Sequence, residues 1–172
     1  MGIHFVLEVE AIFETDVASA ATKALRTNIL SVIKSHNQSV DWLLSAFFAG
    51  GHVLFADVPG TGKTTLAKGL SSSISAEFQR IQFTPDLLPT DILGVLIYDQ
   101  NSQEFRFRHG PIFIQILLAD EINRTSPRTQ SALLKTMAEN QISVEGDRLK
   151  LDDMLFVIAT QKSPSAADQS RD

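Results

Sequence analysis

The stretch ADVPGTGKTTLAKGL, residues 56–70, places glycine, lysine and threonine between an apolar run and a helical pattern. It fits the phosphate-binding pattern G-x-x-x-x-G-K-[ST] except at its first position, where Asp57 stands instead of glycine. Gly60 and Gly62 permit the backbone angles that turn successive N–H groups inward. The pattern therefore predicts a loop that holds the phosphates of a nucleotide. The competing interpretation is an ordinary strand-to-helix turn.

The residues of this loop have expected roles. Lys63 would reach the β and γ phosphates, and the Thr64 hydroxyl would hold Mg²⁺. The helix expected from Thr64 to Ser73 would add the positive end of its dipole. The residues predicted to bind the nucleotide are Pro59, Gly60, Thr61, Gly62, Lys63, Thr64 and Thr65.

Two adjacent acids, Asp120 and Glu121, follow an apolar run at residues 116–119. In phosphate-loop enzymes the aspartate at this point orders Mg²⁺, usually through water, and the glutamate polarises the attacking water. The alternative is that both acids cap a following loop. The two signals occur in the expected chain order, each on its own predicted strand. We therefore predict a site for a nucleoside triphosphate, with Thr64 and Asp120 at the metal and Glu121 as the catalytic base.

The elements that must position these residues alternate along the chain. Short apolar runs predict strands at 52–57, 78–83, 114–121 and 154–160. Periodic patterns predict helices at 16–35, 40–48 and 64–73, and after Ser126-Pro127, a pair typical of a helix start. Two hairpins are expected, one with its turn at 100–103 and one with its turn at Gly146-Asp147. This alternation predicts an α/β fold with a parallel sheet covered on both faces.

Three segments carry more local predictions. Leu133, Leu134, Met137 and Ala138 are expected to form the apolar face of the helix after Pro127. Residues 3–13 alternate between apolar and polar, which predicts a strand, and we hypothesise that it pairs along the strand at 52–56. The alternatives are that it packs elsewhere, pairs with itself in a dimer or starts a longer helix. Residues 162–172 are predicted to be a polar, disordered tail.

Bulk composition limits the classes of protein to which the chain can belong. Its 172 residues, 44% of them hydrophobic and 20% charged, suit one globular domain. The absence of cysteine excludes disulfides and thiolate chemistry. A net charge of −5 argues against a nucleic-acid partner that is held by charge alone. No apolar run approaches the ~18 residues that span a bilayer, and the N-terminus does not look like a signal peptide. We therefore expect a cytoplasmic protein that does not cross a membrane.

Other residues give weaker signals. The four histidines are scattered without metal-ligand spacing, and we interpret them as structural or solvent-facing. Arg106 and Arg108 alternate with two phenylalanines, which makes one face of that strand basic. This face is either a solvated hairpin surface or a contact with a substrate, a partner or a neighbouring subunit. For Arg124 a role at a subunit interface or in sensing the nucleotide is considered.

Much of the chain, from Ile29 to Gln161, resembles the MoxR branch of the AAA+ ATPases. The resemblance rests on GGHVLFADVPGTGKTTLAKGL, RIQFTPDLLPTDILGVLIYD, EFRFRHGPIF and ILLADEINRTSPRTQSALLKTMAEN. It implies a three-layer phosphate-loop NTPase (AAA+) core with strand order 5-1-4-3-2 and two inserted β-hairpins. It also implies ATP as the nucleotide, bound between subunits of a hexameric ring. The implied work is chaperone-like remodelling or maturation of client proteins, with von Willebrand A-domain partners.

The chain departs from the family pattern at several points. Ser35-His36 replaces the usual Gly-Gln before the second helix, and His109 replaces a proline. Lys162 stands where the family has the asparagine that positions water near the γ phosphate. The family's fifth strand, arginine finger and helical lid are expected to be missing. We therefore divide the chain into an N-terminal extension (1–28), an incomplete AAA+ core (29–161) and a polar tail (162–172).

Three functions are compatible with these observations. The first is a MoxR-type ATPase that remodels clients with ATP and Mg²⁺. The second is a nucleotide-binding interaction module that does not hydrolyse, which Lys162 and the missing arginine finger favour. The third is an AAA+ motor that acts on nucleic acid, against which the net charge of −5 weighs. ATP turnover separates the first two, and salt-dependent DNA binding would support the third.

Overall fold

The computed structural model describes residues 19–33, 37–56, 62–144 and 146–161. Residues 19–32 are helical, and the elements that follow are α2 (Asn37–Phe48), β1 (Val53–Ala56), α3 (Lys63–Ser73), β2 (Phe78–Gln82), α4 (Pro89–Leu93), β3 (Gly94–Asp99), β4 (Glu104–His109), β5 (Ile116–Asp120), the 3-10 helix η1 (Ile122–Arg124), α5 (Pro127–Glu139), β6 (Gln141–Val144), β7 (Asp147–Lys150) and β8 (Phe156–Gln161). The expected helices and strands in the described residues are confirmed, with shifted ends.

The central sheet has four strands in the order β1-β8-β5-β2, and all neighbouring pairs are parallel. This matches the 1-4-3-2 part of the strand order that the family resemblance implies. The predicted place of the fifth strand is beside β1, where the described residues put no strand. Residues 3–13, which we hypothesised to pair there, lie outside the described residues, so that hypothesis stays a prediction.

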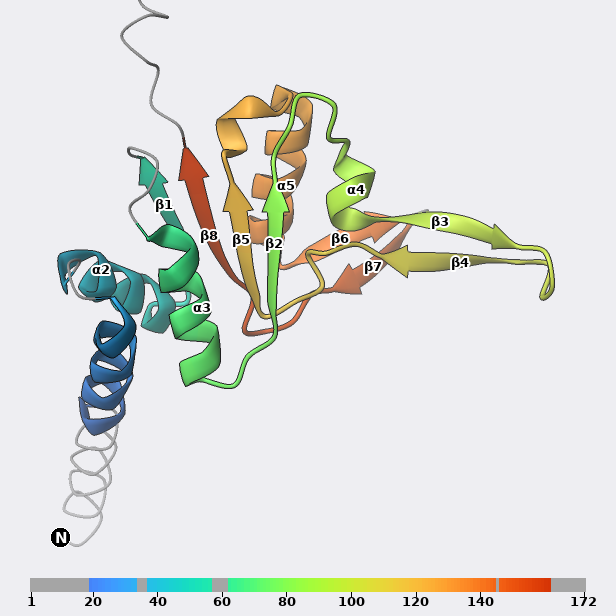
Figure 1. Ribbon diagram of the computed structural model, residues 1–172. Coiled ribbons are helices and arrows are strands. Elements are labelled where there is room, and N and C mark those ends of the chain that lie inside the picture. The colour runs from blue at the N-terminus through green and yellow to red at the C-terminus, as the bar shows by residue number, and fades with distance from the viewer. Residues whose placement is uncertain (1–18, 34–36, 57–61, 145, 162–172) are drawn as a thin grey trace, which may run out of the picture.

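Helices cover both faces of the sheet, which gives three layers (Figure 1). On one face Ile116 and Leu118 pack with residues of α2, α3 and the helix at 19–32. On the other face Leu117 and Ala119 pack with Leu133 of α5 and residues around α4. Successive side chains of a strand point to opposite faces, so a strand buried on both faces is apolar at every position. The sequence ILLA before Asp120 is therefore a consequence of the three-layer fold.

The structure confirms the predicted start of α5 and corrects its predicted apolar face. Ser126 caps α5 as expected, since its side chain accepts a hydrogen bond from the Thr129 backbone N–H. Of the four residues expected on the apolar face of α5, Leu133 is buried and Met137 packs against the core, but Leu134 is 56% exposed and Ala138 is exposed, while Thr129 and Thr136 are buried instead. Residues four and seven apart share one side of a helix, so Leu134 and Ala138 turn away from the side that Thr129 and Leu133 occupy.

The strand expected from residue 154 begins at Phe156 instead. A turn at Asp152 occupies the intervening residues, because the side chain of Asp152 accepts from the Met154 N–H and its carbonyl accepts from the Leu155 N–H. Met154 is left exposed beside this turn. The preceding polar residues therefore decide where the strand starts, although the apolar run itself is longer.

Both hairpins are confirmed, and one turn is corrected. The β3–β4 hairpin pairs Gly94 with His109 and Asp99 with Glu104, which leaves the predicted loop at 100–103, and it projects from the body of the protein (Figure 1). In the second hairpin Val144 pairs with Asp147, so Asp147 belongs to β7 and not to the turn. Gly146 has φ +96°, and a glycine occupies such an angle at either position of a two-residue turn.

None of the helices in the described ranges is long and apolar enough to cross a bilayer.

Candidate functional site

The carboxyl end of the central sheet gathers the residues that the sequence marks for chemistry. Parallel strands end at the same edge, so Asp120 at the end of β5 lies beside Gln82, its register partner at the end of β2. Ala56, the last residue of β1, lines the same pocket as Gly62 and Lys63 at the start of α3. The phosphate-loop helix and the two acids therefore meet at one edge, where ligands of open α/β sheets bind.

The start of α3 suits an anion. Gly62 adopts φ 71° and ψ 15°, a left-handed conformation that glycine reaches without the cost borne by other residues. The helix begins at Lys63, its first turn carries no acid, and no side chain within the described part of the chain caps it. A helix start of this kind favours an anion, because the backbone N–H groups of a first turn have no intrahelical acceptor and the dipole is positive there. Pro59, Gly60 and Thr61 lie outside the described residues.

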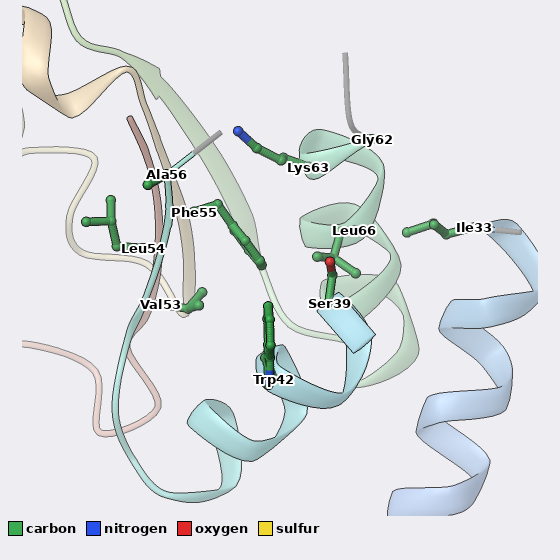
Figure 2. Close-up of a pocket in the computed structure, with 10 residues that line it drawn as sticks. All are labelled: Ile33, Ser39, Trp42, Val53, Leu54, Phe55, Ala56, Gly62, Lys63 and Leu66. Atoms are coloured by element: carbon green, nitrogen blue, oxygen red, sulfur yellow. The ribbon is translucent and has the colours of Figure 1, made fainter. Parts of the chain in front are cut away.

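Lys63 extends from the first turn of α3 toward the end of β1, beside a cavity of about 360 Å³ (Figure 2). Trp42 of α2 and Phe55 of β1 also line this cavity, and the figure shows both rings turned toward it. Thr64 is half-buried and Thr65 is exposed on the next positions of the helix. A charged head group at the rim of an aromatic-lined cavity is an arrangement that binds a molecule with a polar and a flat apolar part.

Asp120 is held by two donors from neighbouring strands. The Thr160 hydroxyl of β8 donates to Oδ1 at 2.5 Å, and Nη2 of Arg80 on β2 reaches Oδ2 at 2.5 Å. The same Thr160 hydroxyl accepts the backbone N–H of Glu121 at 2.9 Å. One buried threonine therefore positions both acids, and the carboxylate of Asp120 is fixed at the edge of the sheet.

Glu121 leaves the strand in a strained conformation. Its φ of 56° and ψ of 48° are left-handed, which costs roughly 1–3 kcal/mol for a residue with a side chain. Its Oε2 accepts from Arg124 Nη1 at 2.8 Å and from Gln82 Nε2 at 3.1 Å. These two donors, one on η1 and one at the end of β2, hold the carboxylate beside β2.

Three residues of this network were not singled out in the sequence: Arg80, Gln82 and Thr160. Arg80 Nη2 donates to Gln82 Oε1 at 3.3 Å and so closes a ring of contacts that joins both acids. The available signal is positional. Arg80 and Gln82 alternate along one predicted strand, and Thr160 ends another, so a parallel sheet with known neighbours would place them beside the acids.

The residues present fit a magnesium nucleotide. Within the described ranges, no group of three or more His, Asp or Glu residues could hold a metal ion by itself. Mg²⁺ usually keeps several waters and binds through one or two carboxylates together with substrate phosphates. A single fixed carboxylate, Asp120, and a hydroxyl, Thr64, meet that requirement when phosphates supply the other oxygens.

His52, His109 and Arg106, which gave weaker signals in the sequence, make structural contacts away from the two acids. His52 accepts the Val157 N–H through Nδ1 at 3.1 Å, and burial lowers the pKa of its imidazole, so it completes the ladder of the sheet. His109 stacks on Phe113 with ring centroids 4.0 Å apart. Arg106 forms an ion pair with Asp99 at 3.5 Å on the exposed β3–β4 hairpin.

Comparison with known proteins identifies the family. A family model described as the ATPase family associated with various cellular activities (AAA) matches residues 52–168, more than half of the chain. The chaperone MoxR1 of Mycobacterium tuberculosis is 42% identical over 130 residues, which are 76% of this chain and 34% of that protein. The chain belongs to the MoxR branch of the AAA+ ATPases. The matched range contains the helix start at Lys63, both acids and the two hairpins.

A second curated protein and a solved structure are also similar to this chain. The uncharacterized protein YeaC of Bacillus subtilis is 58% identical over 118 residues, which are 69% of this chain and 37% of YeaC. A crystal structure of a candidate ATPase from Cytophaga hutchinsonii superposes with a TM-score of 0.68 at 36% identity, over 89% of this chain and 48% of that one. The MoxR-type chain described here thus spans about a third of these curated relatives and about half of the solved chain.

Proposed function

We propose that this chain is the nucleotide-binding part of a MoxR-type ATPase that binds ATP with Mg²⁺ and hydrolyses it to remodel or mature client proteins. The observation that carries the proposal is the meeting of the α3 start, at Gly62 and Lys63, with Asp120 and Glu121 at the carboxyl end of a parallel sheet. A helix start and a lysine favour phosphate, while an acid fixed nearby favours the cation that accompanies it.

Each residue has a proposed role in the reaction. Lys63 would bind the terminal phosphates, and Thr64 and Asp120 would hold Mg²⁺, which when bound neutralises charge on the phosphate oxygens. Glu121 would accept the proton of the attacking water. The other proposed nucleotide contacts are Pro59, Gly60, Thr61, Gly62 and Thr65.

The cavity beside Lys63 is the proposed place of the base. Its volume of about 360 Å³ lies within the range of small-molecule pockets, and Trp42 and Phe55 give it flat apolar walls. Stacking on an aromatic ring contributes about 1–3 kcal/mol per base in proteins that bind single-stranded nucleic acid. Because Trp42 is the sole tryptophan of the chain, its fluorescence reports directly on this cavity.

The finer parts of the proposal come from the family resemblance. A hexameric ring with ATP between subunits, protein clients and a von Willebrand A-domain partner are proposed for the whole protein of which such a core is part. The relative named chaperone MoxR1 supports the chaperone-like role.

A second candidate is a module that binds the nucleotide but does not hydrolyse it. Its support is the contact of Glu121 Oε2 with both Arg124 and Gln82, since an oxygen engaged by two donors must exchange one of them before it contacts the attacking water. Lys162, in the place of the family's asparagine, points the same way.

One experiment tests the main proposal and separates it from the second. ATP is titrated into the chain with and without Mg²⁺ while Trp42 fluorescence is followed, and phosphate release is then measured at saturation. We expect a saturable change in fluorescence and release of phosphate. Saturable binding without release would favour the module, and no binding at any concentration would refute both.

A further inference from the structure

Arg80 forms an ion pair with Asp120, the carboxylate to which the proposed function assigns the metal. On β2 it lies opposite Leu118, two residues before the end of the strand, and its side chain reaches forward to Asp120 at the carboxyl edge. Nη2 contacts Asp120 Oδ2 at 2.5 Å and Gln82 Oε1 at 3.3 Å. A cationic side chain is thus paired with this acid.

The position of Arg80 conflicts with that of a metal. Oδ1 of Asp120 is held by the buried Thr160, whereas Oδ2 is held by the half-exposed Arg80, so the contact at Oδ2 is the one that can change. A water bound to Mg²⁺ and the guanidinium of Arg80 are both hydrogen-bond donors, and both would use this oxygen. Two cations near one carboxylate also repel each other. The repulsion between Arg80 and a divalent ion is stronger than that between Arg80 and a monovalent ion.

The ion pair between Arg80 and Asp120 lies where Arg80 can dissociate into solvent. The side chain of Arg80 is 48% exposed, whereas that of Asp120 is 19% exposed. The guanidinium can therefore move into water and regain its hydration, while the carboxylate stays fixed by Thr160. The same nitrogen serves both Asp120 and Gln82, so the contact does not use the two parallel bonds that make arginine–carboxylate pairs strong.

We propose that Arg80 is a displaceable counter-ion that competes with Mg²⁺ for Asp120 and so sets the metal concentration at which the nucleotide complex forms. The inference rests on the proposed function of the site. Displacement has a second effect, because Arg80 also fixes the amide of Gln82, whose Nε2 holds Glu121. Metal loading at Asp120 therefore loosens one of the contacts that keep Glu121 on the side of β2.

The test measures how the affinity for ATP depends on free Mg²⁺. Trp42 fluorescence gives the dissociation constant of ATP from a chelated, metal-free buffer up to saturating Mg²⁺, for the wild type and for Arg80→Met, Arg80→Lys and Arg106→Met. Methionine keeps the apolar stem of Arg80 and removes the charge. Arg106 is the matched control, because it is an exposed arginine paired with an aspartate, on the β3–β4 hairpin.

We expect Arg80→Met to lower the Mg²⁺ concentration at half-maximal effect by about 1.5- to fivefold, the range of an exposed ion pair. Arg80→Lys should stay near the wild type, and Arg106→Met should match it. An unchanged midpoint, or a higher one, in folded Arg80→Met would overturn the inference, since Arg80 would then be structural or would orient Asp120 for the metal.

A second readout needs no substitution at Arg80. In a ¹⁵N spectrum of the guanidinium groups, adding Mg²⁺ to the ATP-bound wild-type chain should shift the Nε signal of Arg80 and leave that of Arg106 in place. No shift at Arg80 would overturn the inference even if the methionine variant did not fold. ATP binding in the metal-free buffer tests the proposed function separately, so bound ATP with an unaltered Arg80 signal would sink this inference alone.

Discussion

At the amino end of the central sheet polar side chains bond to the backbone, whereas at the carboxyl end they bond mainly to one another, although Thr160 also accepts the Glu121 N–H. His52 accepts the Val157 N–H, and Gln115 Oε1 accepts the Glu77 N–H at 3.0 Å. At the other end Asp120 and Glu121 are joined through Arg80, Gln82 and Thr160. The first pattern completes the ladder of the fold.

The difference shows which end is built for a ligand. A backbone N–H that loses its only acceptor inside a protein is costly, so contacts of the first kind are permanent. Side chains that bond to one another can exchange those partners for phosphate, metal or water. We therefore expect substitutions at the carboxyl end to change nucleotide chemistry, and substitutions at the amino end to change stability alone.

The largest expected effect is on hydrolysis. Glu121→Gln should lower the single-turnover rate of ATP cleavage by about 10²–10⁴-fold, because an amide cannot accept the proton of the attacking water. The affinity for ATP should stay within about twofold, since a proton acceptor acts on the chemical step. The control is Glu104→Gln, the same change on the exposed β4 strand. Loss of ATP binding in folded Glu121→Gln would mean that Glu121 holds the metal or the fold.

The next effect is on binding. Lys63→Ala should weaken ATP binding at least about tenfold, or 1.4 kcal/mol, because a charge-assisted contact to phosphate is removed. Lys68→Ala is the matched control, an exposed lysine further along α3. Calorimetric titration with Mg²⁺-ATP measures both. Equal affinities for the two variants would place the phosphates elsewhere.

At the amino end the expected effect is on stability and its pH dependence. His52→Leu should cost about 1–3 kcal/mol, because the Val157 N–H loses its acceptor. In the wild type burial lowers the pKa of His52 from 6.5, so the unfolded chain binds the proton more readily. The contribution of His52 is complete above that value and is lost as the pH falls from 6.5 through the lower folded pKa.

The substitution His52→Asn should flatten this dependence, since its amide oxygen can accept near the position of Nδ1 without titrating. Urea unfolding between about pH 8 and about pH 5 compares the two proteins. A wild-type stability that did not change more with pH than that of His52→Asn would contradict the role of the histidine.

The smallest effect concerns Gln115. Gln115→Ala should cost about 0.5–1.5 kcal/mol by urea unfolding, because the Glu77 N–H loses its side-chain acceptor at the start of β2. ATP affinity should not change. The control is Gln79→Ala, since Gln79 is an exposed glutamine on β2. A change in ATP affinity with Gln115→Ala would contradict the expectation that substitutions at the amino end of the sheet affect stability alone.

The sequence was sufficient for the elements whose signal is local. Continuous apolar runs located β1, β5 and β8, and Ser126-Pro127 located the start of α5, because burial and capping act on neighbouring residues. Of the corrected details, the buried face of α5 depends on packing, whereas the start of β8 depends on the turn at Asp152 and the second hairpin depends on its register. Four apolar residues in two turns of α5 do not say which side faces the sheet, so Leu134 was misplaced.

The site divides in the same way. Spacing alone places Lys63 after a glycine and Asp120 after an apolar run, so their meeting at one edge could be predicted from the rule that parallel strands end together. Arg80 and Thr160 could not be assigned, since their contacts depend on which strands are neighbours and on the direction of each side chain. The register of β2, β5 and β8 supplies that information.

The central claim is that the carboxyl end of the sheet binds Mg²⁺-ATP, and a crystal structure of the chain with Mg²⁺ and a non-hydrolysable ATP analogue tests it most directly. The account predicts phosphates over the first turn of α3 in contact with Lys63, with the metal between them and Asp120 and the base beside Trp42. Phosphates bound away from Lys63, or a metal without Asp120 in its inner or water-mediated shell, would contradict it.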